Sequence, residues 1–389
     1  RVESAQTRIK FVTEALLLRQ MASDPQLKGI GAVVFDEFHE RNLHSDVALA
    51  LARRLQETGR PDLLLVAMSA TLDTEGVARW LGSAETLAAD GRTFPVDVEY
   101  THQPRNSTRP VWDAAAEQVR RILQEEVEGD ILVFMPGKGE IQAALGALSA
   151  ARLGERVALI PLHGELAPDD QDRAFQPSPL RKIVVSTNVA ETSVTIDGIR
   201  HVVDGGLARM ARYDAERGIQ TLMVEEISRA SADQRAGRAG RTAPGTCWRL
   251  WTESGHLNRP ARNTPEIQRA DLAEVVLLLH SLGVRQAATF DWLDAPDKAA
   301  VLRAERLLFI LGALEGDQGS EGRGFDLTPV GRQMLRLPMH PRFARLLVEA
   351  SRRGCVPAAC LCAALVSGRD LLARLDRDDA DTKAAREIS

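Results

Sequence analysis

Two adjacent acids and a histidine stand at the end of an apolar run in the stretch VVFDEFHER, residues 33–41. Asp36 and Glu37 follow the apolar residues directly, and His39 comes two positions later. An acid at the carboxyl end of a parallel strand can hold Mg²⁺ through water, and a neighbouring acid can orient or deprotonate an attacking water. The same acids would also be favourable at the start of an ordinary helix. The stretch alone leaves both interpretations open.

A more specific signal is the stretch SADQRAGRAGRTAPG, residues 231–245. If its central part is helical, Gln234, Arg238 and Arg241 lie on one face because they are spaced at i, i+4 and i+7. Arg235 would then point elsewhere. We predict that this face contacts phosphate, for which arginine is well suited.

The glycines of the same stretch favour this interpretation over a solvated basic helix. Each glycine inside a helix costs about 1 kcal/mol relative to alanine. We interpret Gly237 and Gly240 as keeping the surface low enough for a polyphosphate to approach.

The stretch VVSTNVAETSVTIDGI runs from an apolar segment into a predicted helix. Asn188 would be its N-cap and Glu191, three residues later, would complete a capping box. Free backbone amides at such a helix start, beside the hydroxyls of Ser186 and Thr187, would also bind phosphate. Capping without a ligand and phosphate binding remain equally open here.

Two weaker stretches contain hydroxyl residues at element boundaries. MSAT ends an apolar run with Ser69 and Thr71, and VTEALLLR places Thr13 at a helix start with Arg19 further along. Taken alone, the second pattern favours ordinary helix capping.

The apolar runs that precede these residues are typical of parallel strands. Through roughly the first 250 residues, such runs alternate with longer helical patterns, and each run is continuous rather than alternating. This pattern predicts strands buried on both faces of a parallel sheet, whose ligands bind at the carboxyl ends. The runs are GAVVFDE, LLLVAMSAT, ILVFMPG, RVALIPLHG, KIVVSTN and HVVDGG.

Three further segments divide the chain. Residues 90–110 are rich in Pro, Arg and Thr and indicate a domain boundary. Residues 208–227 resemble a β-hairpin with its turn at 216–218. Beyond about residue 258 the pattern is helical, and residues 315–324 indicate a flexible turn or a wing.

Composition adds limits to these interpretations. The chain has 389 residues, enough for two or three domains, and its formal charge of −5 requires any nucleic-acid surface to be local. Six of its 49 basic residues are lysines and the rest are arginines. The four cysteines have neither zinc-site nor disulfide-framework spacing, so we expect reduced, mostly buried thiols. No apolar run approaches the ~20 residues of a membrane span, and a cytoplasmic location without membrane contact is expected.

Taken in order, six segments resemble the motifs of the superfamily 2 helicases of the DEAH/RHA group. TEALLLR is similar to motif Ib, DEFH to motif II, SAT to motif III, LVFMPGKGEI to motif IV, STNVAETSVTIDGI to motif V and QRAGRAGR to motif VI. Phe38, where most of the group has alanine, and the continuation DEFHERNLHSD are most similar to bacterial HrpB-type helicases. The resemblance covers the whole chain.

The resemblance implies an α/β fold with tandem RecA-like parallel-sheet domains, followed by a mainly α-helical winged-helix and ratchet-like region. It implies the C-terminal part of the first RecA-like domain at 1–94 and the second RecA-like domain at 95–257. A winged-helix domain would follow at 258–325, and the start of a helical ratchet domain at 326–389.

The implied activity is ATP-dependent RNA unwinding with ATP and Mg²⁺ as cofactors. Asp36 would hold Mg²⁺, through water, together with Glu37, which would polarise the attacking water. His39 would hydrogen-bond across the cleft to Gln234.

The family resemblance also implies roles for residues of motifs IV to VI. Arg238 and Arg241 would reach the γ-phosphate, with Arg241 as the arginine finger, whose removal typically costs ~10³ or more in rate. Ser193 and Asp197 match positions near the nucleotide, and Phe175 would stack on adenine.

Nucleic-acid contacts are implied at Thr13, Arg19, Thr187 and Asn188, which match positions that touch RNA phosphates. Ser69 and Thr71 would couple the nucleotide state to domain movement. The partner would be single-stranded or structured RNA; phosphate contacts do not distinguish it from DNA, and such a grip is salt-sensitive.

Two departures from the family pattern stand out. Ala15 replaces the usual glycine of motif Ib, and no G-x-x-x-x-G-K-[ST] occurs, since PGKGE around Lys138 lacks the Ser or Thr that would bind Mg²⁺. We therefore expect motifs I and Ia upstream of Arg1 in a longer protein that also continues beyond the last residue. A catalytically silent RNA-binding or scaffold module is the alternative function.

Overall fold

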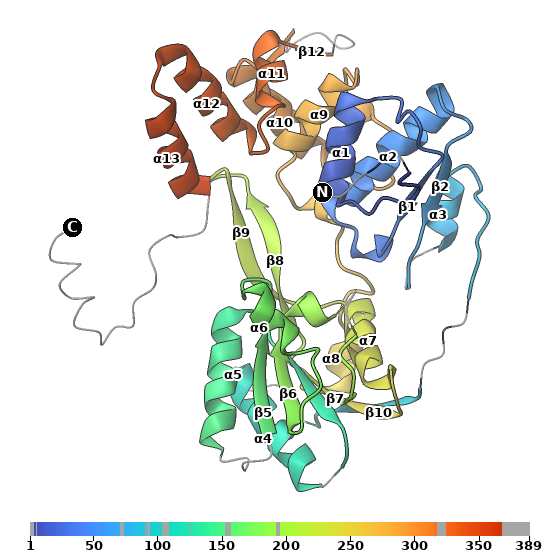
Figure 1. The fold of residues 1–389 in the computed structure, drawn as a ribbon, viewed down its shortest axis with the longest axis vertical. Helices are drawn as coiled ribbons and strands as arrows, with labels where there is room; N and C mark the ends of the chain where they lie inside the picture. The colour runs from blue at the N-terminus through green and yellow to red at the C-terminus, as the bar shows by residue number, and fades with distance from the viewer. Residues whose placement is uncertain are drawn as a thin grey trace, which may run out of the picture. The chain divides into compact units, whose positions relative to one another are not determined.

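In the computed structural model, the chain forms two compact units (Figure 1). One unit comprises residues 29–270, and the other comprises 1–28 with 271–389. The structure describes residues 4, 6–70, 74–89, 91, 94–102, 109–125, 127–151, 157–191, 195–316 and 324–367.

The larger unit contains a six-stranded sheet in which every neighbouring pair is parallel. Its strand order is β3-β10-β7-β4-β6-β5. The four apolar runs predicted as strands after residue 129 form β4 to β7, which confirms them, whereas β3 and β10 were not predicted. The strands are β3 (Val96–Tyr100), β4 (Asp130–Phe134), β5 (Val157–Leu162), β6 (Arg181–Ser186), β7 (Ile199–Asp204) and β10 (Gly245–Arg249).

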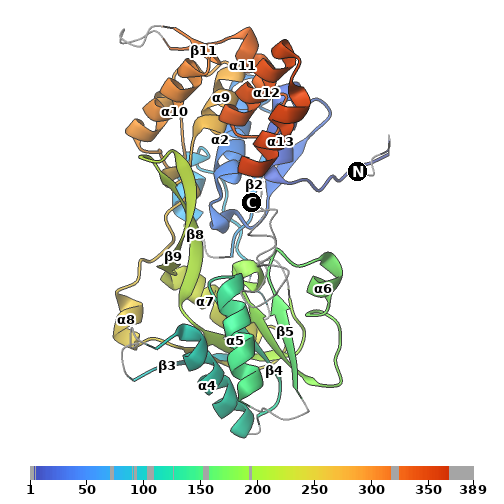
Figure 2. The ribbon, with the colours of Figure 1, turned by 90° about the vertical axis from the view of Figure 1, so that its left-hand side faces the viewer.

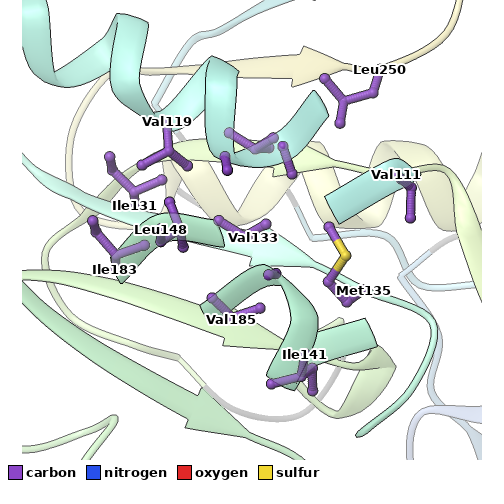
Figure 3. Close-up of a cluster of buried hydrophobic side chains, with 14 of the residues drawn as sticks. Val111, Val119, Ile131, Val133, Met135, Ile141, Leu148, Ile183, Val185 and Leu250 are labelled. Atoms are coloured by element: carbon purple, nitrogen blue, oxygen red, sulfur yellow. The ribbon is translucent and has the colours of Figure 1, made fainter. Parts of the chain in front are cut away.

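Two helices cover one face of this sheet, α4 (Val111–Gln124) and α5 (Lys138–Ala150) (Figure 2). Their apolar side chains pack with those of the central strands in one buried cluster, where Val119 and Leu148 meet Val133 (Figure 3). Successive residues of a strand point to opposite faces, so the strand residues between those of this cluster point to the other face of the sheet.

The opposite face packs against small residues of short helices. The cluster there joins Leu132 and Val184 to Ala190, Ala236 and Ala239. These alanines come from η2 (Asn188–Ala190), α7 (Arg229–Gly237) and η3 (Arg238–Gly240). The sheet thus has two covered faces, as its continuous apolar runs predicted.

A second parallel pair in the same unit is only partly covered. It joins β1 (Ala32–Phe35) and β2 (Leu64–Ala67), and it is followed and flanked by η1 (Phe38–Glu40), α2 (Leu43–Thr58) and α3 (Thr74–Trp80). Val33 and Phe35 are buried, but Val34 is 53% exposed and Leu64 is 59% exposed. The prediction of two buried faces is therefore wrong for this pair: β1 alternates between core and solvent, and no residue of β2 is buried.

The predicted hairpin is confirmed as β8 (Leu207–Asp214) and β9 (Ile219–Glu226), which pair in antiparallel register. Asp214 closes the turn, because its carboxylate accepts the backbone N–H groups of Glu216 and Arg217. Gly218 ends the turn with a φ of +65°. The remaining short elements of this unit are α6 (Pro168–Asp172), α8 (Glu253–Leu257) and η4 (Glu266–Gln268).

The smaller unit is mainly helical, as predicted for the region beyond residue 258. Its elements are α1 (Glu14–Ser23), α9 (Ala273–Ser281), η5 (Ala287–Thr289), α10 (Lys298–Ile310), α11 (Pro329–Met334), α12 (Pro341–Arg353) and α13 (Val356–Ser367). Two short strands, β11 (Leu314–Glu315) and β12 (Asp326–Leu327), pair in antiparallel register. They flank most of the segment interpreted as a turn or wing, of which residues 317–323 lie outside the described residues.

A polar bridge joins two helix starts of this unit. Asp271 accepts the backbone N–H of Ala273 at the start of α9, and it lies 3.0 Å from His340 Nε2. His340 Nδ1 in turn accepts the N–H of Arg342 in α12. Burial opposes the charge of Asp271, but the hydrogen bonds from His340 and Ala273 outweigh it and lower the pKa of Asp271.

The cysteines are free thiols, as predicted, but three of the four are exposed. Cys247 is buried in β10, whereas Cys355, Cys360 and Cys362 lie at or in α13. Their expected burial was therefore wrong. Across the described parts of the chain, the helices are too short or too polar to span a bilayer.

Candidate functional site

The two acids of the opening stretch lie where the sequence predicted them, directly after strand β1. Glu37 has a φ of +49°, and its N–H donates to Asp36 Oδ1 at 2.8 Å. The backbone N–H of Phe38 donates to Met68 O at 2.9 Å, so the segment remains tied to the end of β2. Asp36 is exposed and Glu37 is partly exposed, which leaves both carboxylates accessible to a ligand.

An apolar side chain anchors this acidic segment. Phe38 is completely buried and packs edge-on against Phe35, with ring centroids 6.3 Å apart. The guanidinium of Arg41 lies over the Phe38 ring, 5.6 Å from the ring centroid. The 3₁₀ turn that directly follows the acids is thus anchored by packing of Phe38.

His39 lies beside Glu37 with its side chain 6% exposed. Its Nε2 is 3.5 Å from Glu37 Oε2, and neither ring nitrogen hydrogen-bonds to any described residue in this structure. The contact between His39 and Gln234 therefore stays a prediction, and Gln234 is half-buried on α7.

A residue far along the chain fixes the other end of the acidic segment. The backbone N–H of Glu266 donates to Arg41 O, and the Glu266 carboxylate accepts the N–H of Leu43 at 2.8 Å. Arg41 also forms a two-pronged ion pair with Asp46, at 2.8 and 3.0 Å. The first turn of α2 is thus completed by a side chain more than 200 residues later.

The arginine-rich stretch differs from the single helix predicted for it. Helix α7 ends at Gly237 and tightens into the 3₁₀ turn η3. The carbonyl of Gly240 accepts the N–H of Phe94, and a Cβ on Gly240 would lie 2.5 Å from Phe94 O. Gly240 is therefore required by this backbone contact, and its interpretation as clearance for a polyphosphate was wrong. Gly237, in contrast, has open space around its missing side chain.

Arg235, which was expected only to point elsewhere, is the buried centre of this region. It is 1% exposed, and its Nε lies 2.8 Å from Glu191 Oε2 while its Nη1 lies 2.9 Å from Asp204 Oδ1. Its guanidinium stacks on Phe134 at 4.7 Å. Burial opposes the charge, but the carboxylates of Asp204 and Glu191 outweigh it and raise the pKa of Arg235.

The predicted capping box is also corrected. The Glu191 carboxylate accepts from the Ser231 hydroxyl and from Arg235, and its backbone carbonyl accepts from Arg238. Of the helix predicted after β6, the described residues form only the 3₁₀ turn η2. Thr187, which precedes this turn, makes no side-chain cap. A signal for the buried arginine was present, because Arg235 shares the helix face of Ala232 and Ala239, which pack inward.

Arg238 and Arg241 line a small recess with residues of motif V. Its other lining residues are Leu132, Ala190, Thr195, Ile196 and Ile199. Arg238 is almost fully buried, whereas Arg241 is exposed. Burial and the neighbouring charge of Arg241 lower the pKa of Arg238 to about 10, and the carboxylates of Glu37 and Glu191 partly counteract this shift. An anion in the recess would favour the charged form of Arg238.

The other nucleotide residues of the prediction are only partly described. Phe175 is half-buried against the sheet core, and Asp197 is exposed before β7. Ser193 lies outside the described residues, as does Thr71. Ser69 is half-buried after β2.

The predicted RNA-contacting residues are divided between the two units. Thr187 and Asn188 follow β6 at the carboxyl edge of the large sheet, with Asn188 exposed. Thr13 and Arg19 are exposed at and in α1, in the other unit. Thr187 and Asn188 are thus neighbours in the larger unit, whereas Thr13 and Arg19 belong to the smaller unit.

The neighbouring carboxylates of Asp36 and Glu37 are the kind of ligand that suits Mg²⁺. The described residues contain no group of three or more His, Cys, Asp or Glu side chains that could hold a metal ion. Mg²⁺ typically takes one or two carboxylates from a protein and completes its shell with waters and substrate phosphates. The Asp36 and Glu37 pair therefore fits Mg²⁺ bound together with a nucleotide.

Comparison with known families gives two matches. Residues 114–243 match the helicase conserved C-terminal domain. Residues 304–339 match the winged-helix helicase associated domain (HA2).

Individual relatives are found among bacterial helicases. The chain is 38% identical to the ATP-dependent RNA helicase HrpA of Escherichia coli K12, over 99% of this chain and 30% of the relative. It is 42% identical to the ATP-dependent RNA helicase HrpB of the same strain, over 88% of this chain and 41% of the relative.

Solved structures agree with these sequence relatives. The crystal structure of E. coli DExH-box NTPase HrpB is 38% identical and superimposes with a TM-score of 0.84, covering 99% of this chain and 47% of that one. A second, of E. coli DEAH/RHA helicase HrpB, gives 39% identity and a TM-score of 0.85, with 98% and 47% coverage. The chain spans less than half the length of each of these relatives. The expected parallel-sheet architecture with a winged helix is thus confirmed, and by sequence and fold the chain belongs to the DEAH/RHA-type helicases of the HrpA and HrpB kind.

Proposed function

We propose that the protein, in its full-length form, is an ATP-dependent RNA helicase that couples ATP hydrolysis to movement along RNA and to its unwinding. The observation that carries this proposal is that two accessible acids after β1 belong to the same compact unit as a recess lined by Arg238 and Arg241. Glu37, which follows β1, acts on the charge of Arg238, which follows α7, although the two residues are far apart in sequence. An acid that can activate water and an arginine that can reach the γ-phosphate are what phosphoryl transfer requires.

In this proposal Glu37 orients and polarises the attacking water, and Asp36 would hold Mg²⁺ through water. When bound, the metal neutralises charge on the phosphates. Arg238 and Arg241 stabilise the charge on the γ-phosphate, and Arg241 is the exposed member of the pair. The burial of Arg238 makes its charge more effective, because little water screens it.

The remaining residues keep their proposed roles around this centre. His39 bonds to Gln234 when nucleotide is bound, Phe175 stacks on adenine, and Ser193 and Asp197 lie near the nucleotide. Thr13, Arg19, Thr187 and Asn188 hold RNA phosphates, while Ser69 and Thr71 transmit the nucleotide state. We also propose that the protein acts in the cytoplasm.

A second candidate function rests on a sequence observation. Residues 1–389 contain no G-x-x-x-x-G-K-[ST]. A polypeptide of these residues alone would then bind RNA without hydrolysing ATP. RNA binding without turnover by residues 1–389, together with RNA-stimulated turnover by the full-length protein, is the expected pattern.

The test of the main proposal is Glu37→Gln in the full-length protein. This change keeps the shape of the side chain but removes the carboxylate, so RNA-stimulated ATP hydrolysis should fall by about 10³-fold or more. ADP binding, measured by calorimetry, should persist because Glu37 acts on water rather than on the nucleotide.

The matched control is Glu40→Gln, an exposed acid in the 3₁₀ turn that follows Glu37. Its turnover should stay within about twofold of wild type, as for most surface substitutions. Wild-type turnover in Glu37→Gln would show that this carboxylate does not activate water.

A further inference from the structure

A buried lysine at the start of β6 holds two separate backbone segments. The side chain of Lys182 is 4% exposed, although it carries a charge. Its Nζ lies 3.2 Å from Ala174 O and 3.3 Å from Gln176 O, and 3.5 Å from Asp197 O. Phe175 lies between the first two of these carbonyls.

The chemistry of this site suits lysine rather than arginine. An ammonium group has three N–H donors pointing in different directions, which match the three carbonyls, whereas a guanidinium directs its donors in one plane. Only six of the 49 basic residues in this chain are lysines, so a lysine in this buried position is unusual for the chain. A buried charge of this kind is stable only when its donors are satisfied and a counter-charge is near.

Asp130 supplies the counter-charge and extends the network. Its Oδ2 lies 3.7 Å from the Lys182 ammonium, and its Oδ1 accepts the Lys182 backbone N–H at 2.8 Å. Its own backbone N–H donates to Gly198 O at 2.8 Å. Gly198 has a φ of +91°, and a Cβ there would lie 2.9 Å from Asp130 Oδ2. The turn after Asp197 is therefore fixed from both sides.

We propose that Lys182 is a positioning residue for the adenine side of the nucleotide site. It holds the backbone on both sides of Phe175 and at Asp197, so that the two residues keep a fixed relation to each other. The inference rests on the proposed function, in which Phe175 and Asp197 meet the nucleotide. Stacking on a base depends on the placement of the aromatic ring, so loss of the ammonium weakens the base-dependent part of binding.

The experiment compares ADP with pyrophosphate, using calorimetry on the full-length protein. Lys182→Met removes the ammonium and keeps much of the side-chain length. We expect the Kd for ADP to rise about fivefold to tenfold, the range of a partly lost base stack. The Kd for pyrophosphate should not change, because it lacks the base. A general loss of folded structure would instead weaken both ligands equally.

The matched control is Arg259→Met, which removes another buried cation that binds two backbone carbonyls. Arg259 Nη1 lies 2.9 Å from both Gly206 O and Ile227 O, at the root of the hairpin. This variant should lower the unfolding temperature without changing the ratio of the two dissociation constants. If Lys182→Met does not fold, Lys182→Gln retains two N–H donors and should give a smaller rise in the same ratio.

Phe175→Ala separates the two levels of the proposal. If Phe175→Ala weakens ADP binding and Lys182→Met leaves the ADP to pyrophosphate ratio unchanged, the role of Lys182 is wrong and the proposed function stands. If Phe175→Ala does not affect ADP binding, the base contact and the role of Lys182 are both wrong. Wild-type protein that binds no ADP would overturn the proposed function itself.

Discussion

The acidic and the arginine-bearing segments of the candidate site are held in place by different forces. Under the acids lies Phe38, a completely buried aromatic side chain packed against Phe35. Under the arginines lies Arg235, a buried cation held by two carboxylates. Apolar packing is nondirectional, whereas a buried ion pair requires all partners in place. The arginine segment should therefore tolerate less change in its support than the acidic segment.

The largest expected effect is on the arginine segment. Arg235→Met removes the cation but leaves Glu191 and Asp204 in the interior, so we expect the free energy of unfolding to fall by about 3–5 kcal/mol. Urea unfolding followed by circular dichroism measures this change.

Arg241→Met is the control for that experiment. Arg241 is exposed, and removing it should change stability by no more than about 0.5 kcal/mol. A stability loss in Arg241→Met as large as that in Arg235→Met would show that the buried ion pairs are not the main support.

The acidic segment is tested by Phe38→Ala, which introduces the residue that most of the DEAH/RHA group has at this position. Here the ring fills the space below the acids, so its removal should leave a cavity and cost about 3 kcal/mol, at the lower end for Phe→Ala because the neighbouring partly open sheet can relax. The same unfolding assay applies, with Val34→Ala as the control.

Val34 lies on the exposed side of the same strand pair, and its truncation should cost under about 1 kcal/mol. If Phe38→Ala lowered the free energy of unfolding as little as Val34→Ala does, packing of Phe38 would not be what holds the acids in place.

The smallest effects come from the two glycines of the arginine segment, and they should have opposite signs. Gly240→Ala places a Cβ against Phe94 O and should cost about 1–3 kcal/mol. Gly237→Ala meets open space near the end of α7 and should be neutral or stabilising by up to about 1 kcal/mol. Equal melting temperatures for the two variants would contradict the close approach seen at Gly240.

Patterns local in sequence predicted the elements and the residue types of the site. Strands β4, β6 and β7 are continuous apolar runs, so their burial on two faces followed from the sequence, whereas β5 lies at the sheet edge and is buried on one face. Strands β3 and β10, with the sequences VDVEY and GTCWR, mix polar and apolar residues and gave no such signal. The polar residues that end β1 were also correctly placed after a strand.

The supports of the site were not predictable in the same way. Glu191 was interpreted as a cap because capping involves residues three apart, yet its carboxylate binds Ser231 and Arg235, some forty residues away. Gly240 was assigned to the ligand for a related reason, since its close contact with Phe94 is invisible in a local pattern. Contacts between segments that are distant in sequence can be recognised only in the tertiary structure.

Glu266 has a consequence for the order in which this chain folds. Its carboxylate completes the first turn of α2, which begins at Leu43. During synthesis, this bond to the helix start can form only after the residues of the six-stranded sheet have been made, about 10–45 s later at 5–20 residues per second, although Asn42 caps the helix locally before that. The acidic segment beside it would reach its final stability only after that delay, so a ribosome-bound chain ending before Glu266 should hold its acids more loosely than the released protein.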